Sequence, residues 1–118
     1  MGHLFGDKIL NKLGDIVKAA IRETELAARY GGEEFAIVMS NTGLEQAVEI
    51  GERIRKSIKA CNFDIENFFT TVSIGIALYP SDSNSLQELL SNADRALYRA
   101  KHNGKNRVCS YCDSLKDK

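Results

Sequence analysis

The chain has 118 residues, and its 16 basic and 16 acidic side chains give a formal net charge of zero. This balance excludes the strongly basic surface that binds nucleic acid or anionic membranes nonspecifically, so we expect neither partner. The length suits one domain over residues 1–118. Because the chain has no signal sequence and no apolar run of roughly 20 residues, we expect a cytoplasmic protein or the cytoplasmic domain of a larger sensor.

The first predicted elements are a helix and a β-hairpin. Apolar side chains recur at helical spacing over residues 7–22 and predict an amphipathic helix there. Two short apolar runs on either side of Gly31-Gly32 predict a hairpin over residues 25–40. Its second strand is apolar on both faces, so we expect it to lie inside a sheet that is covered on both sides.

A second helix and a strand follow. The capping-box spacing of Thr42 and Glu45 predicts the start of a helix that runs to about Lys59. Alternating apolar side chains predict a strand over residues 72–78. Within that strand, Gly75 indicates a point of close packing.

The last third of the chain predicts one more helix and one more strand. Ser85 and Glu88 form a second capping box, and Asn103-Gly104 supplies the stop signal of the helix that begins there. Residues 106–111 are typical of a final strand. Helices that alternate with strands in this way predict an α/β sandwich, which can also be described as α+β.

The connector of the predicted hairpin carries the most informative residues. Glu33 and Glu34 place two adjacent carboxylates at its tip, beside the two glycines that leave the backbone open to a ligand. Mg²⁺ is usually held by one or two carboxylates together with substrate phosphates. By residue type alone, this connector is either a metal and phosphate site or a solvated acidic turn.

The sequence G-G-E-E-F over residues 31–35 resembles the signature of the GGDEF family, the diguanylate cyclases, in its GGEEF form. Other segments are similar to family segments in the same order, namely residues 2–10, 28–30, 71–77, 93–101 and 104–108. The resemblance implies a nucleotidyl-cyclase-like fold with a ferredoxin-type mixed sheet flanked by helices. In the family, a strand from the middle of the sheet and a helix precede the segment that here begins at residue 2. We therefore expect an N-terminally truncated domain.

The resemblance also implies an activity, the condensation of two GTP molecules into cyclic di-GMP in bacterial second-messenger signalling. Two domains face each other in this reaction, and each holds one GTP and a divalent cation, Mg²⁺ or Mn²⁺. Glu33 would ligate the metal and help to deprotonate the attacking hydroxyl, while Glu34 would contact the metal or the ribose. Gly31 and Gly32 would let the phosphates approach the backbone.

Further roles are implied at more distant positions. Asp7 would bind the guanine edge, although its residue type also suits a helix N-cap. Lys101 and Lys105 would bind phosphates, or would simply stabilise a helix dipole. Lys105 stands where the family usually has arginine and lacks the bidentate fork of that residue. Arg22 and Glu25 occupy the R-x-x-D positions of the product-inhibition site, with glutamate in place of aspartate.

The expected truncation has two consequences. The opening strand would supply a metal-binding aspartate and the following helix an asparagine that reads guanine, so we expect these 118 residues alone to be poorly active or inactive. Loss of a central strand would also expose two strand edges, which favours a homodimer or higher self-association, including strand exchange. The alternative function is a non-catalytic module for GTP binding, cyclic di-GMP binding or self-association.

Overall fold

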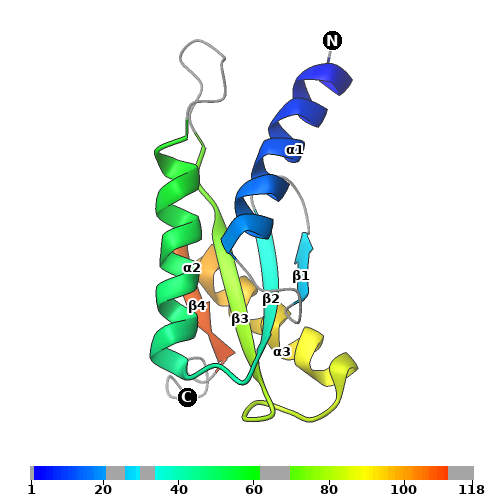
Figure 1. Ribbon diagram of the computed structural model, residues 1–118, viewed down its shortest axis with the longest axis vertical. Coiled ribbons are helices and arrows are strands. Elements are labelled where there is room, and N and C mark those ends of the chain that lie inside the picture. The colour runs from blue at the N-terminus through cyan, green and yellow to red at the C-terminus, as the bar shows by residue number, and fades with distance from the viewer. Residues whose placement is uncertain (1, 21–25, 30–33, 62–69, 112–118) are drawn as a thin grey trace.

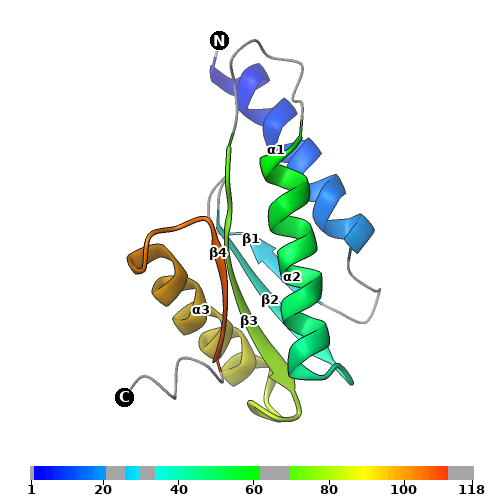
Figure 2. The ribbon, with the colours of Figure 1, turned by 90° about the vertical axis from the view of Figure 1, so that its left-hand side faces the viewer.

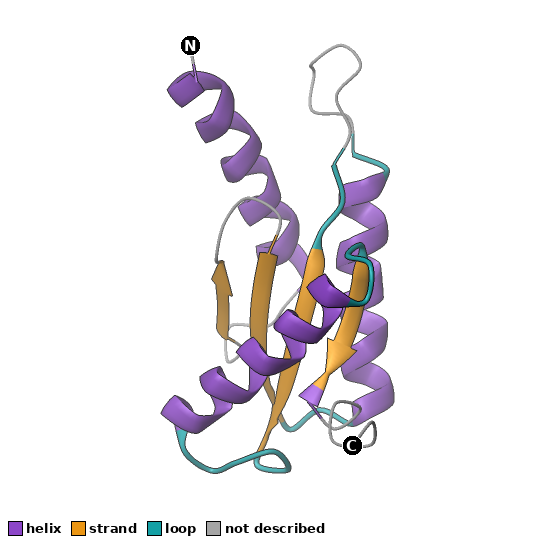
Figure 3. Ribbon diagram, turned by 180° about the vertical axis from the view of Figure 1, so that it is seen from behind, coloured by secondary structure: helices purple, strands orange, loops and turns teal. Residues whose placement is uncertain are grey.

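The computed structural model describes residues 2–20, 26–29, 34–61 and 70–111, with side chains described for residues 11–20, 34–61 and 70–111. These residues form one sheet with helices on both of its faces (Figure 1, Figure 3). The helices are α1 (Gly2–Ala20), α2 (Leu44–Lys59) and α3 (Leu86–His102). The strands are β1 (Leu26–Arg29), β2 (Glu34–Ser40), β3 (Ser73–Tyr79) and β4 (Arg107–Ser110). Within these residues, no helix is both long and apolar enough to span a lipid bilayer.

The sheet is mixed and has the strand order β1-β2-β3-β4. β1 and β2 form the predicted antiparallel hairpin, with Arg29 opposite Phe35. β2, β3 and β4 are parallel to one another. Because parallel strands begin at the same edge of a sheet, Glu34, Ser73 and Arg107 lie in register across the three strands. This amino-terminal edge carries the candidate site.

The two faces of the sheet are covered by different helices. In Figure 2, α1 and α2 lie on one side of the sheet and α3 lies on the other. The core under α1 and α2 is built from large aliphatic and aromatic side chains of the strands and both helices, which include Leu13, Phe35, Ile37, Ile54, Ile74 and Ile76. The core under α3 consists of smaller side chains, chiefly Ala36, Val38, Ala77, Leu89 and Ala93. Burial on both faces confirms β2 as an interior strand.

Small residues let α3 approach the sheet closely. A Cβ atom added at Gly75 would lie 2.2 Å from the backbone nitrogen of Leu97 and 2.3 Å from the carbonyl oxygen of Ala93. Real Cβ atoms do not come so close to backbone atoms. The prediction of close packing at Gly75 is therefore confirmed, and this contact fixes the position of α3 along β3.

The helix starts agree with the predictions only in part. Ser85 caps α3 as expected, and its hydroxyl accepts a hydrogen bond from the Glu88 amide at 3.4 Å. The capping box at Thr42 is wrong, because the N-cap of α2 is Gly43 and the Thr42 hydroxyl donates to the carbonyl of Ser40 at 2.8 Å. The start of the first helix at residue 7 is also wrong, since α1 begins at Gly2.

The expected open edges in the middle of the sheet are not found in the described strands. β2 pairs directly with β3 along its whole length, from Glu34 opposite Ser73 to Ser40 opposite Tyr79. The 16-residue helix α2 is long enough to connect two neighbouring parallel strands. The backbone groups that a missing strand would have left unpaired satisfy one another here. Self-association therefore receives no support from an open edge between these two strands.

Candidate functional site

The candidate site lies where the parallel strands begin and where α3 ends. Glu34 is the first residue of β2, and Lys101 lies in the last turn of α3. Because α3 connects the end of β3 to the start of β4, its C-terminal turn returns to the edge at which the strands begin. Chain connectivity therefore brings together an acidic and a basic side chain that are far apart in the sequence.

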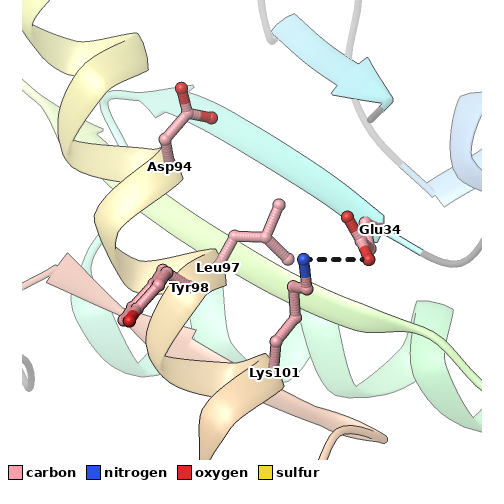
Figure 4. A pocket seen from close by; sticks show the side chains of 5 residues that line it. All are labelled: Glu34, Asp94, Leu97, Tyr98 and Lys101. Atoms are coloured by element: carbon pink, nitrogen blue, oxygen red, sulfur yellow. Dashed lines mark ion pairs between the residues drawn. The ribbon is translucent and has the colours of Figure 1, made fainter. Parts of the chain in front are cut away.

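An open pocket of about 220 Å³ lies between the first residue of β2 and one face of α3. Figure 4 shows the side chains that line it, which are Glu34, Asp94, Leu97, Tyr98 and Lys101. Glu34 comes from β2, and the other four come from one face of α3, where side chains three or four residues apart are neighbours. The pocket thus combines carboxylates, one ammonium group and an aromatic ring.

The closest polar contact in this pocket is an ion pair. The Nζ atom of Lys101 lies 3.1 Å from Oε2 of Glu34, and the two side chains are 34% and 28% exposed (Figure 4). Partial burial strengthens the attraction relative to a pair in bulk water, while access from solvent remains. A cation that can bind phosphate and a carboxylate that can bind a metal are therefore held in contact at the mouth of the pocket.

A tight loop follows α3 and leads into β4. Its residues Gly104, Lys105 and Asn106 all have positive φ, at 120°, 61° and 47°. The amide of Lys105 donates to the carbonyl of Ala100 at 3.0 Å, which ties the loop to the last turn of α3. The side chain of Lys105 is exposed. This loop thus adds a second lysine next to the helix end that carries Lys101.

Several predicted site residues lie outside the described residues. These are Gly31, Gly32 and Glu33 of the hairpin connector, and the inhibitory-site pair Arg22 and Glu25. The roles assigned to them stay predictions.

Asp7 lies within α1, whose first residue is Gly2, so the interpretation of Asp7 as a helix N-cap is wrong. Its predicted contact with guanine stays untested, because its side chain is not among those described.

Three residues of the pocket received no role from the sequence. Asp94, Leu97 and Tyr98 lie in the segment that resembles the family, but only its last residue, Lys101, received a function. Helical spacing could have found them, because positions 94, 97 and 98 lie on the same face of a helix as Lys101.

The described residues of the site could bind a metal ion only if phosphate groups of a ligand supplied some of its ligands. Within residues whose side chains are described, no group of three or more histidine, cysteine, aspartate or glutamate residues could hold a metal ion. Glu34 and Asp94 line the same pocket, which is at most two carboxylates. Mg²⁺ is commonly held by one or two carboxylates, with substrate phosphates and waters as its other ligands. A metal held by protein ligands alone does not fit these residues.

Comparison with known proteins gives consistent matches. A profile of the family described as "Diguanylate cyclase, GGDEF domain" matches residues 1–107. Diguanylate cyclase A of Treponema denticola is 42% identical over 109 residues, which cover 91% of this chain and 29% of that protein. Diguanylate cyclase DgcM of Escherichia coli is 39% identical over 107 residues, or 91% of this chain and 26% of that protein. The chain therefore spans less than a third of the length of either relative.

Comparison with solved structures also matches the chain to GGDEF domains. The active GGEEF domain of a diguanylate cyclase from Vibrio cholerae aligns with a TM-score of 0.76 and 35% identity, over 94% of this chain and 71% of that chain. The GGDEF domain of DgcB from Caulobacter crescentus, solved in complex with c-di-GMP, aligns with a TM-score of 0.70 and 28% identity, over 94% and 67% of the two chains. The mixed sheet described above is therefore shared with these domains.

Proposed function

The chain belongs to the diguanylate cyclase GGDEF domain family, and on this premise we propose that it takes part in the condensation of two GTP molecules into cyclic di-GMP. The observation that carries the proposal is the 3.1 Å contact between Glu34 and Lys101 at the mouth of the pocket. It joins the carboxylate of the family signature to the lysine that the family resemblance assigns to phosphate. Since GTP is an intracellular nucleotide, the proposed reaction belongs to the cytoplasm.

The proposed reaction consists of two equivalent transfers. The 3′-oxygen of one GTP forms a bond to the α-phosphorus of the other, and pyrophosphate leaves with the electrons of the bond that breaks. Glu33 would take the proton of the attacking hydroxyl, and Glu34 would orient the ribose or bind the metal. Lys101 and Lys105 would neutralise the phosphate charge that develops on the leaving group.

Recognition of the nucleotide would use other residues. Gly31 and Gly32 would let the phosphates approach the backbone, because neither residue has a side chain there. Asp7 would accept hydrogen bonds from the guanine edge. GGDEF diguanylate cyclases use divalent cations, and we propose that Mg²⁺ or Mn²⁺ is held by Glu33 and Glu34 and supplies charge neutralisation at the phosphates.

The reaction requires two copies of the site. One domain holds one GTP, so the two nucleotides react only when two domains face each other, and we propose a homodimer as the reacting species. Product formation should then rise more steeply than in proportion to protein concentration. Higher assemblies, including strand exchange, are a weaker part of this proposal, because β2 and β3 pair with each other.

The 118 residues on their own should be a weak catalyst. Among these 118 residues, none was matched to the metal-binding aspartate or to the guanine-reading asparagine that the family resemblance implies. Loss of one metal ligand commonly lowers a rate by orders of magnitude, because metal placement and charge neutralisation both suffer.

The second candidate function is a module that binds GTP or cyclic di-GMP without turnover. It is favoured by Lys105, which replaces the family's arginine, and by the limited metal ligation within the described residues. Product would bind at Arg22 and Glu25, where the longer glutamate side chain alters the geometry of the family's pair.

Incubation with GTP and either Mg²⁺ or Mn²⁺, followed by chromatography for cyclic di-GMP, tests the enzyme proposal. Glu34→Ala should abolish product. Glu49→Ala is the matched control, because Glu49 is 75% exposed on α2 and should leave product formation unchanged. Binding of a fluorescent GTP analogue is measured in parallel. Binding without product supports the second candidate, and folded protein that does neither contradicts both.

A further inference from the structure

We propose that Arg55 is a positioning residue for Lys105, which it holds in place through the side chain of Asn106. The inference rests on the proposed function, since it is there that Lys105 binds the phosphates of GTP. Arg55 lies on α2, a helix that contributes no residue to the pocket between β2 and α3. Its effect on the nucleotide would be indirect.

The guanidinium group of Arg55 is fixed by its own helix. Its Nε donates to Oε1 of Glu52 at 3.0 Å, and its Nη2 donates to Oε2 of the same carboxylate at 2.8 Å. This is a bidentate pair, the geometry in which arginine and carboxylate bind most strongly. The Arg55 side chain is only 17% exposed, so little water competes for it. These two bonds fix the guanidinium plane, and with it the position of the third nitrogen, Nη1.

The Nη1 atom of Arg55 contacts the loop that carries Lys105. Nη1 of Arg55 donates to Oδ1 of Asn106 at 3.0 Å, a contact between residues far apart in the sequence. Asn106 directly follows Lys105 and precedes β4. The hydrogen bond therefore connects α2, on one face of the sheet, to the loop at the end of α3, on the other face.

The loop needs such support because of its backbone. Lys105 and Asn106 both have positive φ, which costs free energy in residues other than glycine. Arg107 supports the loop from the other side, because its Nε donates to the carbonyl of Lys105 at 3.1 Å. A Cβ atom at Gly104 would lie 2.7 Å from Nη2 of Arg107, so that guanidinium also covers the glycine. Two arginines thus hold the loop in one conformation.

The consequence is a pre-organised phosphate contact. Lysine is a flexible point charge, so its affinity for phosphate depends on where the backbone places it. Without the Arg55 contact, the loop would sample other conformations, and GTP binding would have to order it. We expect loss of Arg55 to weaken the contribution of Lys105 and to leave other parts of the nucleotide site unchanged.

A double-mutant cycle in the 118-residue chain tests this coupling. Binding of a fluorescent GTP analogue is measured for the wild type, Arg55→Ala, Lys105→Ala and the double variant. Arg55→Ala should weaken binding about three- to tenfold, the effect of one hydrogen bond. The double variant should bind no more weakly than Lys105→Ala alone. Equal, independent losses from the two substitutions, or no loss from Arg55→Ala, would overturn the inference.

Two further variants separate positioning from general destabilisation. Arg53→Ala removes an arginine of the same helix whose contact with Glu49 is long, at 3.9 Å, and it should leave binding unchanged. Arg55→Lys keeps the charge without the bidentate geometry and should restore binding only in part. Thermal unfolding of every variant shows whether it is folded at the temperature of the titration.

Amide hydrogen exchange tests the inference independently of GTP. The Lys105 amide, which donates to Ala100, should exchange faster in Arg55→Ala and at the wild-type rate in Arg53→Ala. If the wild type fails to bind the GTP analogue while this exchange difference is present, the proposed function is wrong and the positioning of Lys105 stands. An unchanged exchange rate in Arg55→Ala contradicts the positioning role, whatever the binding result.

Discussion

Lys101 and Glu34 form an ion pair of 3.1 Å between the last turn of α3 and the first residue of β2. The pair occupies the mouth of the pocket at the edge where the three parallel strands begin. In this structure, each partner neutralises the charge of the other. A phosphate group would compete with Glu34 for the lysine, and a metal ion would compete with Lys101 for the carboxylate.

Lys101→Met should weaken binding of a fluorescent GTP analogue at least about tenfold, because it removes the charge-assisted contact with phosphate that we propose for Lys101. The free energy of unfolding should fall by less than about 1 kcal/mol, since partly exposed ion pairs contribute little to stability. Lys59→Met, in the last turn of α2, is the control for a lost surface charge. Unchanged affinity in Lys101→Met would remove this residue from the nucleotide site.

Gly75→Ala should destabilise the fold by about 3 kcal/mol or more, because its methyl group would overlap the backbone of α3. The matched substitution is Gly14→Ala in α1, where a Cβ atom meets nothing within 4 Å. That variant should be more stable by about 0.5–1 kcal/mol, since alanine is the better helix former. Urea unfolding of both variants measures their free energies of unfolding, which should fall for Gly75→Ala and rise for Gly14→Ala. Equal stability of the two variants would contradict the packing of α3 against β3.

Glu52→Gln should be less stable than the wild type at neutral pH and similar to it in acid. Hydrogen bonding from Arg55 lowers the pKa of Glu52 below its ordinary value of 4.5. The ionised carboxylate therefore contributes stability at pH values above 4.5, and this contribution disappears as the pH falls through the lowered folded-state pKa. Urea unfolding of both proteins across this range measures the difference. A gap in stability that persists at low pH would mean that Glu52 stabilises the fold by packing and not by charge.

Ser85→Ala should cost about 0.5–1 kcal/mol, because the Glu88 amide loses its acceptor at the start of α3. Ser85→Asp should largely retain the stability, since aspartate is also a good N-cap residue. Hydrogen exchange at the Glu88 amide locates the effect, and it should accelerate in Ser85→Ala only. The hydroxyl of the half-buried Ser83 accepts from the Ser85 amide at 3.1 Å, while Ser85 is the residue that caps Glu88, so Ser83→Ala should leave exchange at the Glu88 amide unchanged.

Short sequence motifs predicted the local structure correctly where a few neighbouring residues determine the backbone conformation. The hairpin, the close packing at Gly75 and the cap at Ser85 all depend on neighbours in the sequence or on the absence of a side chain. The pattern at Thr42 failed because the N-cap of α2 is one residue later, at Gly43, and the Thr42 hydroxyl donates to the carbonyl of Ser40 in the preceding strand. A capping motif shows that a bond between the side chain and a helix amide is possible. Other backbone groups nearby, such as those of the preceding strand, can bond to the same side chain.

The sequence by itself determined the family, the order of helices and strands, and the residue types available for phosphate and metal. Periodicity and short motifs carry this information because they act over a few neighbouring residues. Only the tertiary structure decided that β2 pairs with β3, that Glu34 meets Lys101, and that Arg55 reaches Asn106. Each of these contacts joins segments far apart in the chain, and each depends on how the helices pack across the sheet, which no local pattern encodes.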